Sequence, residues 1–449
     1  MPDAPAGFKR EIGLRDLILF NISSVVGIRW LAAAAHTGPG SITLWILAAI
    51  LFFVPCAYAV AALARRFPEE GGIYVWTKQA FGNWHGFLCG WLYWINLVFF
   101  IPSLLLAGVG MALYTVGGQY TELAESRVYM LGASLVILWG VLYLQIIGVG
   151  IGKWTENAGG MAVYAVCIVL MTAAIAIGYK YGPATKFNLA PEWNLGKLNF
   201  WSQLVFAFGG LELGAAMGGE IRQPDKNLPR AAWISGASIC AFYILGTISM
   251  LILIAPKDVN VITGIAQAGA AAGARLGLPW ISPVLAILLT FGVAGQIGAW
   301  MSGCARLPFA IGVNRYLPAS FARLHPKWRT PHVALLWQGV GCTVFLIAMQ
   351  SGQTMRAGYQ LLVDMSTITY FIPFLYMFAA AWKYGQKIAG GAGLFVIAAG
   401  LGFAFLPIAD TGNVWLFEIK LIAGCALCIL PARILFRAAT VRERFLGRA

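Results

Sequence analysis

Charged residues are scarce in this 449-residue chain. It has 31 Lys and Arg and 17 Asp and Glu, so only 11% of its residues are charged, whereas soluble domains have about a quarter. Charge at this density cannot cover a water-facing surface, which excludes soluble domains, disordered chain and coiled coils. All eight cysteines fall within long apolar runs, which also argues against a disulfide scaffold. We therefore expect a membrane protein.

Signatures of other functional classes are missing as well. The four histidines are scattered, and the sequence has no zinc-type Cys/His spacing, no Gly-x-Ser-x-Gly and no phosphate-binding Gly-x-x-x-x-Gly-Lys. It has no repeated filter and no rings of charge of the kind that channels use. The net charge of +14 does not indicate nucleic acid, because Lys and Arg are distributed between the apolar runs. We expect no catalysis, no metal and no cofactor.

Apolar runs long enough to cross a bilayer recur along the whole chain. A helix needs about 20 residues to span the hydrocarbon core, and continuous runs of that length exclude a barrel of short alternating strands. The sequence predicts an all-α membrane protein with twelve transmembrane helices, over residues 15–36, 41–64, 84–116, 128–147, 157–180, 200–221, 230–255, 280–312, 332–350, 358–382, 392–409 and 414–436.

Two of these spans are interrupted near the middle of the membrane. The first contains SSVVGIRW at residues 23–30, and the sixth contains FAFGGLELG at residues 206–214. Each opens a set of five spans, which is typical of inverted-repeat transporters. Half-helix ends leave N–H groups that attract a carboxylate and carbonyls that attract a cation. A zwitterionic amino acid satisfies both, so we expect the substrate between the two breaks.

The predicted organisation follows from the spans and from the positive charges. It comprises a tail over residues 1–14, five-helix repeats over 15–180 and 200–382, two further helices over 392–436 and a tail over 437–449. Most Lys and Arg lie on the side that the termini share, which predicts cytoplasmic termini in the plasma or inner membrane. The first fifteen residues have no small-residue cleavage site, so we expect no removable signal peptide. Oligomeric state is not indicated.

Seven short motifs recur in order along the chain: RFPEEGGIY at 66–74, AFG at 80–82, GFLCGW at 86–91, FAFGGLE at 206–212, PDKNLPRA at 224–231, NRYLP at 314–318 and HPKWRTP at 325–331. Together they resemble the amino acid–polyamine–organocation permeases, over about residues 12 to 385. The FIP at residues 100–102 and the character of the first span are most similar to the glutamate/γ-aminobutyrate antiporter branch.

The resemblance implies a leucine-transporter-type fold with broken helices 1 and 6. It also implies alternating access and an α-amino acid or related amine bound at the breaks. Phe206 falls where relatives place an aromatic gate, and Glu212 falls on the family's helix-6 glutamate. Residues 25–27 occupy the place of the family's Gly-x-Gly turn. The substrate-binding residues expected on this basis are Val25, Val26, Gly27, Ile28, Arg29, Phe206, Ala207, Phe208, Gly209 and Gly210.

Arg29 stands where the family usually has Phe, and an Arg at mid-membrane needs a partner or a function. It has three candidate roles: pairing with Glu212, binding a substrate carboxylate, or replacing a transported cation. Sodium-independent members use a helix-5 lysine for the last role, and that position falls near Gly159 here. A sodium site assisted by Ser302 is the alternative.

Glu212 is the candidate for proton coupling, because a carboxylate in a dry cavity can load and release a proton near neutral pH. Its alternative is a structural ion pair or a backbone cap. We expect Asp364 to lie near a membrane interface. The leading hypothesis is a secondary amino-acid transporter, either an exchanger or proton-coupled. An amino-acid sensor without net transport is the alternative.

Overall fold

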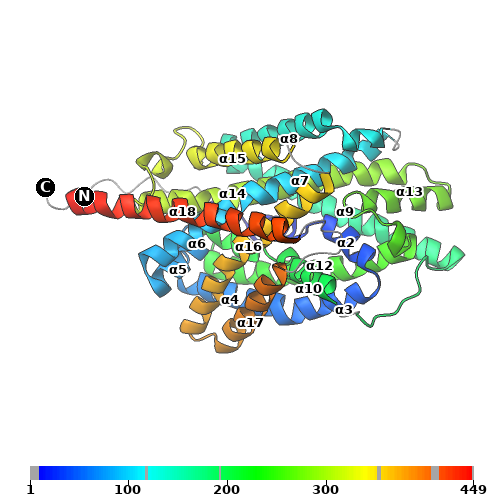
Figure 1. The fold of residues 1–449 in the computed structure, drawn as a ribbon, viewed down its shortest axis with the longest axis horizontal. Coiled ribbons are helices and arrows are strands. Elements are labelled where there is room, and N and C mark those ends of the chain that lie inside the picture. Colours follow the sequence, from blue (N-terminus) through cyan, green and yellow to red (C-terminus); the bar gives the residue numbers. More distant parts are fainter. Residues whose placement is uncertain (1–9, 117–119, 192–193, 351–354, 406–413, 447–449) are drawn as a thin grey trace.

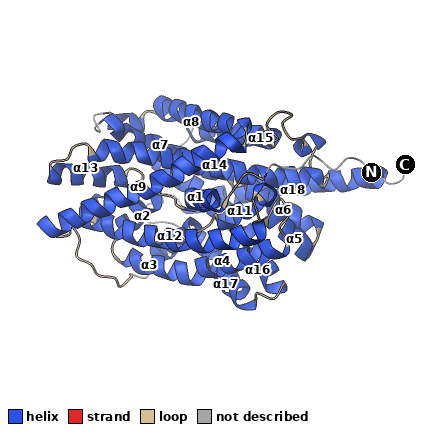
Figure 2. Ribbon diagram, turned by 180° about the vertical axis from the view of Figure 1, so that it is seen from behind, coloured by secondary structure: helices blue, strands red, loops and turns tan. Residues whose placement is uncertain are grey.

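The computed structural model describes residues 10–116, 120–191, 194–350, 355–405 and 414–446 (Figure 1). The predicted terminal tails and the end of the eleventh predicted span lie partly outside these ranges. The described residues form helices and no strand, and Ile12 and Ile221 make one isolated β-bridge. The all-helical prediction is confirmed (Figure 2).

The first half of the chain forms nine α-helices and three shorter turns. They are α1 (Leu14–Val25), α2 (Arg29–Thr37), α3 (Gly40–Ala48), η1 (Ala49–Phe53), α4 (Val54–Arg66), α5 (Ile73–Phe81), α6 (Asn83–Ile95), α7 (Leu97–Ala112), η2 (Leu113–Val116), η3 (Thr121–Glu125), α8 (Arg127–Ile147) and α9 (Val149–Tyr181).

The second half begins with another broken helix and ends with two helices outside the repeat pattern. Its elements are α10 (Leu195–Ala207), α11 (Leu211–Ala216), η4 (Gly218–Glu220), α12 (Pro224–Leu253), η5 (Pro256–Asp258), α13 (Gly264–Leu276), α14 (Ile281–Val313), η6 (Ala319–Ala322), α15 (His332–Gln350), α16 (Met355–Lys383), α17 (Lys387–Ala404) and α18 (Val414–Leu446).

Long apolar helices dominate the fold, and many of their side chains face outward. Among the described residues, nine helices are long and apolar enough to cross a membrane, and the bent pair α1–α2 makes a tenth. Val128 is 84% exposed and Ile388 is 91% exposed, a pattern suited to lipid rather than water. The chain is a multi-pass membrane protein. The count of twelve spans stays a prediction.

Both predicted helix breaks are present. The axis turns by 46° between α1 and α2, where Val26, Gly27 and Ile28 are not helical. Between α10 and α11, Gly210 has φ +125°, a conformation that favours glycine. Figure 2 places α1 and α11 in the middle of the bundle, with α9, α12 and α14 around them. The breaks therefore lie inside the protein, where other groups can satisfy the freed backbone.

Helix α9 begins eight residues before its predicted span. Gly148, at φ +129°, precedes its first turn, and Lys153, Glu156 and Asn157 made this region appear too polar for a span. The helix packs closely against α14 at a pair of glycines. A Cβ built on Gly159 would lie 2.6 Å from the Gly295 Cα. The two backbones meet without side chains between them, at the position where the resemblance implied a lysine.

The glycine contact between α9 and α14 should tolerate no added methyl group. Gly159→Ala forces backbone atoms apart, and overpacking of this kind costs about 1–3 kcal/mol. We expect a lower midpoint of thermal unfolding for the detergent-purified variant. Gly140→Ala on α8 is the matched control, because a Cβ there meets nothing within 4 Å. Equal midpoints for the two variants would contradict the close contact.

Candidate functional site

The hydroxyl of Tyr243 joins the two helix breaks. This residue of α12 accepts a hydrogen bond from the Gly27 N–H at 3.0 Å. Its own proton is shared between the carbonyl oxygens of Val25, at 2.8 Å, and Ala207, at 2.9 Å. Both carbonyls are at helix ends that lack the usual partner one turn ahead. One fully buried side chain therefore holds three of the predicted site residues together: Val25, Gly27 and Ala207.

Ser24 strengthens the same junction from the end of α1. Its hydroxyl lies 3.4 Å from the carbonyl oxygen of Gly210. Its own carbonyl accepts hydrogen bonds from the indole N–H of Trp300, at 2.8 Å, and the amide of Gln296, at 3.1 Å. Both donors belong to α14. The end of α1 is thus held against the second break and against α14 at once.

Glu212 is the second residue of α11, in the first turn of the second half of the broken helix, and is 1% exposed. Its Oε1 accepts hydrogen bonds from the hydroxyls of Tyr93 on α6 and Tyr370 on α16, each at 2.5 Å. Its Oε2 accepts from the Gly210 N–H at 3.1 Å. Short bonds from three donors favour the ionised carboxylate, and burial favours the neutral acid. These opposed effects suit a group that gains and loses a proton.

Arg29 is the first residue of α2 and is 3% exposed. Its Nη1 donates to the Ser103 hydroxyl of α7 at 2.7 Å. The guanidinium lies over the rings of Trp30 and Phe100, with its carbon 4.7 and 5.2 Å from the ring centroids. Arg29 is therefore bound by groups other than those that bind Glu212. Of the three roles, the pairing with Glu212 has no support in these contacts.

Aromatic rings connect the environments of Arg29 and Glu212. Phe206 lies edge-on to Trp30, Phe100 and Tyr370, with centroid distances of 6.0, 5.8 and 5.3 Å. Gly209 is required here, because a Cβ on it would lie 2.3 Å from the Tyr370 ring. The predicted gate residue Phe206 thus lies between the buried cation and the buried carboxylate.

The remaining predicted residues are distributed differently. Ile28 points toward α14, where its Cδ1 fills the space beside Gly292. Phe208 packs against Trp45 and Phe53, away from the Phe206 cluster, so its position is that of a core residue. Asp364, expected near a membrane interface, is 1% exposed within α16, and its depth in the membrane stays a prediction.

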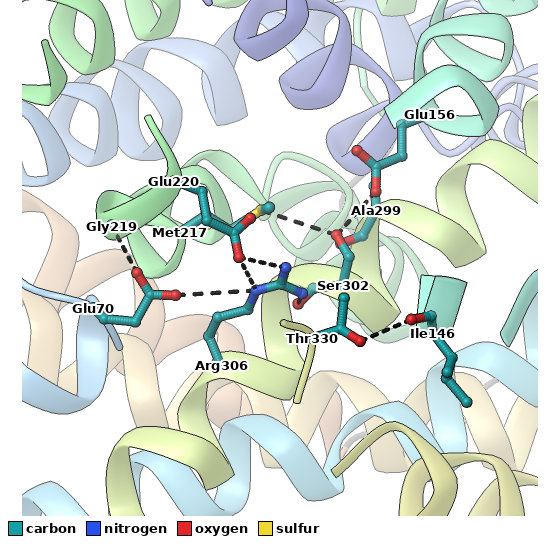
Figure 3. Close-up of polar contacts among 10 residues, drawn as sticks. All are labelled: Glu70, Ile146, Glu156, Met217, Gly219, Glu220, Ala299, Ser302, Arg306 and Thr330. Carbon is teal, nitrogen blue, oxygen red and sulfur yellow. Dashed lines mark hydrogen bonds and ion pairs between the residues drawn. The ribbon is translucent and has the colours of Figure 1, made fainter. Parts of the chain in front are cut away.

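A second buried polar cluster lies beyond the end of α11 (Figure 3). Arg306 of α14 donates from Nη2 and Nε to Glu220 Oε1, at 2.7 and 3.2 Å. Its Nη1 donates to the carbonyl of Ser302, and its Nε lies 4.0 Å from Glu70 Oε1. Arg306 and Glu220 were not among the predicted site residues, although both fall inside predicted spans. Their proximity to Glu70 arises only in the fold, and no single stretch of sequence shows it.

The loop before α5 makes hydrogen bonds to α11 and η4, through its backbone and through the Glu70 side chain. The Gly219 N–H donates to Glu70 Oε2 at 2.7 Å, and the Gly71 N–H donates to the Ala216 carbonyl at 3.1 Å. Gly72 adopts φ +42°, and a Cβ on it would lie 2.9 Å from the Ala216 nitrogen. The RFPEEGGIY motif therefore serves to join this loop to the end of α11.

Burial raises the pKa of the Glu70 carboxyl to about 8, and repulsion from Glu220 acts in the same direction. Attraction to Arg306 and the hydrogen bond from the Gly219 N–H oppose the shift. The Glu70 side chain is 15% exposed, so it lies at the edge of the cluster nearest to water.

Glu156 of α9 extends the cluster on its other side (Figure 3). It is 4% exposed, and its Oε1 accepts a hydrogen bond from the Ser302 hydroxyl at 2.9 Å. The hydroxyl of Ser302, which was considered as a sodium ligand, is bonded to this carboxyl group, and the sodium site stays a prediction. Glu156 was not among the predicted site residues, because it precedes the apolar run from which the span was recognised.

Comparisons with known proteins agree with this architecture. The family profile described as amino acid permease matches residues 12–416. An uncharacterized transporter of Legionella pneumophila is 27% identical over 94% of this chain and 95% of its own length. A glutamate/gamma-aminobutyrate antiporter of Lactococcus lactis is 22% identical over 86% of this chain and 82% of its own. The crystal structure of MhsT in complex with L-phenylalanine matches with a TM-score of 0.65 at 15% identity, over 96% of this chain and 100% of that chain. The structural match confirms the leucine-transporter-type fold.

The Tyr243 hydroxyl should be needed to hold the two breaks together. Tyr243→Phe leaves buried backbone groups at Gly27, Val25 and Ala207 short of a partner, a loss of about 1–3 kcal/mol. We expect a lower thermal midpoint for the purified variant. Tyr179→Phe is the control, since that side chain is 95% exposed. A midpoint equal to that of the control would show that the breaks are held by other contacts.

Glu70 should make stability fall as the pH rises. Between its ordinary pKa and about 8, the folded protein holds a proton on Glu70 that the unfolded chain releases. The free energy of unfolding therefore decreases through this window and levels off above it. We expect the thermal midpoint of Glu70→Gln to depend less on pH between about pH 5 and about pH 9. The exposed neighbour Glu69, changed to Gln, is the control and should keep the wild-type slope.

Proposed function

The chain belongs to the amino acid permease family, and from this premise we propose that it is a secondary active transporter that moves an amino acid or related amine by alternating access. The family and the named relatives are transporters, so the chain is not an enzyme. The observation that carries the proposal is the junction of the two broken helices, with Arg29 and Glu212 buried beside it. Irregular backbone within a membrane is found where it lines a binding site.

We infer that Arg29 binds a carboxylate of the substrate. Its position at the start of α2 adds the positive end of a half-helix to the guanidinium charge. A planar guanidinium is suited to bidentate binding of carboxylates. The rings of Trp30, Phe100 and Phe206 exclude water around it and so strengthen the attraction. This favours acidic amino acids, or others with a free carboxylate, over amines that lack one.

We infer that Glu212 couples transport to a proton. In its ionised form it holds Tyr93 of α6 and Tyr370 of α16 against the second half of the broken helix. When Glu212 is protonated, one of its oxygens becomes a donor, and two hydroxyls no longer find a charged acceptor. Protonation thus weakens the contacts of α11 with two neighbouring helices. That provides a physical link between the proton and movement of the break.

The orientation in the membrane is part of the same proposal. Lys and Arg gather on the side that the termini share, which supports cytoplasmic termini in the plasma or inner membrane. The cluster of Glu70, Glu220 and Arg306 then lies on the cytoplasmic side of the junction. In the structure described here, its ion pairs join α14, η4 and the loop before α5. This arrangement corresponds to a closed cytoplasmic side.

Uptake of a panel of radiolabelled amino acids and amines into proteoliposomes tests the proposal. The assay is run with and without a proton gradient, sodium, and internal unlabelled substrate. We expect a carboxylate-bearing substrate to accumulate with the proton gradient. Glu212→Gln should weaken the response to the gradient while retaining exchange, and Arg29→Gln should weaken binding of carboxylate substrates by about 2–3 kcal/mol. The exposed Glu122, changed to Gln, is the control.

The other outcomes distinguish the alternatives. Uptake that requires internal substrate and ignores the gradient would identify an exchanger without proton coupling. Dependence on sodium would contradict the replacement of a transported cation by Arg29. Saturable binding without movement in any condition would favour the sensor over the transporter.

A further inference from the structure

We propose that Glu156 of α9 is a second proton-binding site of the transport cycle, separate from Glu212. The inference rests on the proposed transport function and concerns its coupling. It starts from a buried carboxyl group that the substrate site does not use: Glu156 is 4% exposed, and Ser302 of α14 is its hydrogen-bond donor at 2.9 Å.

The charges of the cluster do not balance when every carboxyl group is ionised. Three carboxyl groups, those of Glu70, Glu156 and Glu220, surround the one guanidinium of Arg306 (Figure 3). Two of the guanidinium's N–H groups are directed to Glu220 and a third to the Ser302 carbonyl. Glu156 therefore has a neutral hydroxyl, not a cation, as its nearest bonded partner. A buried charge without a counter-charge is costly, and such a group becomes neutral instead.

The surroundings of Glu156 suit both of its protonation states. A serine hydroxyl donates to a carboxylate and accepts from a carboxylic acid, so the 2.9 Å contact serves either form. Gln145 of α8 lies on the same side: its amide nitrogen and the Glu156 Cγ both adjoin Gly298. This amide is a second hydrogen-bond donor to the Glu156 carboxyl group, beside the Ser302 hydroxyl.

Polar contacts extend from Glu156 to the edge of the protein. The Ser302 hydroxyl contacts Glu156, the Ser302 carbonyl accepts from Arg306, and Arg306 contacts both Glu220 and Glu70, which is 15% exposed. A guanidinium does not release its proton near neutral pH, so these contacts order the cluster and water carries the proton. The raised pKa of Glu70, about 8, lets it exchange protons with water near neutral pH.

Other ionisable groups face the cluster from neighbouring elements. Glu11, next to the Ile12–Ile221 bridge, adds negative charge near Glu220. Asp16 of α1 accepts a hydrogen bond from Asn157, the residue after Glu156. Lys153 precedes Glu156 by one turn on α9 and is partly exposed. Arg306 remains the buried cation of the described cluster, and the nearby acidic groups oppose a further negative charge.

The structure indicates which movement would release the proton. Glu156 and Ser302 belong to α9 and α14, which are held together by the Gly159–Gly295 contact. Glu220 and Glu70 belong to η4 and the loop before α5, which are joined to α14 through Arg306. Separation of η4 and the loop from α14 would let water reach Glu156. The carboxylic acid then releases H⁺ to water and becomes a carboxylate; no other bond changes.

Proteoliposome transport measurements test the inference. Glu156→Gln retains the size and hydrogen bonding of the protonated side chain but cannot titrate. We expect exchange at equal pH to stay within about twofold of wild type, and accumulation to fall about tenfold under a gradient of about one pH unit, the equivalent of one coupled proton. Glu122→Gln on η3 is the matched control and should leave both quantities unchanged.

The outcomes separate this inference from the proposed function. Gradient-driven accumulation by Glu156→Gln equal to wild type would overturn the inference and leave the transporter assignment in place. A wild-type protein that exchanges substrate without any response to the gradient would do the same. A wild-type protein that moves no member of the panel would overturn both.

Infrared spectroscopy of purified protein gives a readout that does not depend on transport. In a background that carries Glu212→Gln and Glu70→Gln, we expect a carboxylic-acid C=O band at neutral pH that becomes weaker when Glu156→Gln is added. An unchanged band would contradict the inference. If Glu156→Gln does not fold, Ser302→Ala is the second variant, and it should shift the pH at which the band disappears. An unchanged pH in that variant would count against Glu156 as the source.

Discussion

The hydrogen bonds of the Tyr243 hydroxyl are the contact on which the rest of the site depends. Breaking a helix inside a membrane frees N–H and C=O groups that have no water to bind. Here one phenolic oxygen serves groups from both broken helices, at Gly27, Val25 and Ala207. The two breaks are therefore fixed relative to each other. Everything that approaches them, including Phe206 and Arg29, takes its position from that junction.

Buried charges lie in two places: beside the helix breaks, and beyond the end of α11. Arg29 and Glu212 lie beside the junction: a hydroxyl and aromatic faces contact Arg29, and two phenols with one N–H contact Glu212. Nearer the end of α11, Arg306 and Glu220 form a direct ion pair. A direct pair of this kind closes a contact between elements.

Much of the fold follows from the sequence because lipid imposes simple requirements. Continuous apolar runs predicted the long helices, and glycines beside charges at residues 27–29 and 209–212 predicted both breaks. The start of α9 was missed for the same reason that Glu156 was missed. Hydropathy treats a polar turn as solvated, but here the turn is covered by α14 and α8. The likeness to permeases identified the motifs but not the contacts among them.

Side-chain pairings across the bundle could not be predicted at all. Tyr93, Tyr243 and Tyr370 lie in apolar runs that contain many aromatic residues, and nothing in their local sequence distinguishes them from packing residues. Their role appears only when helices far apart in sequence are brought together around Glu212 and Gly27. Phe208 shows the opposite case, since it adjoins the break in sequence yet packs into the core.

The close approach of the loop before α5 to the end of α11 has a mechanical consequence. Gly71 and Gly72 bring the backbone of this loop into direct contact with the backbone of Ala216. No side chain separates the two backbones. Displacement of α11 must therefore carry the loop with it, and through the loop the adjoining ends of α4 and α5. The motif at residues 66–74 then acts as a stiff linkage that transmits motion of the substrate site to the protein surface. A change in the loop would alter the rate of the cycle without altering what the protein binds.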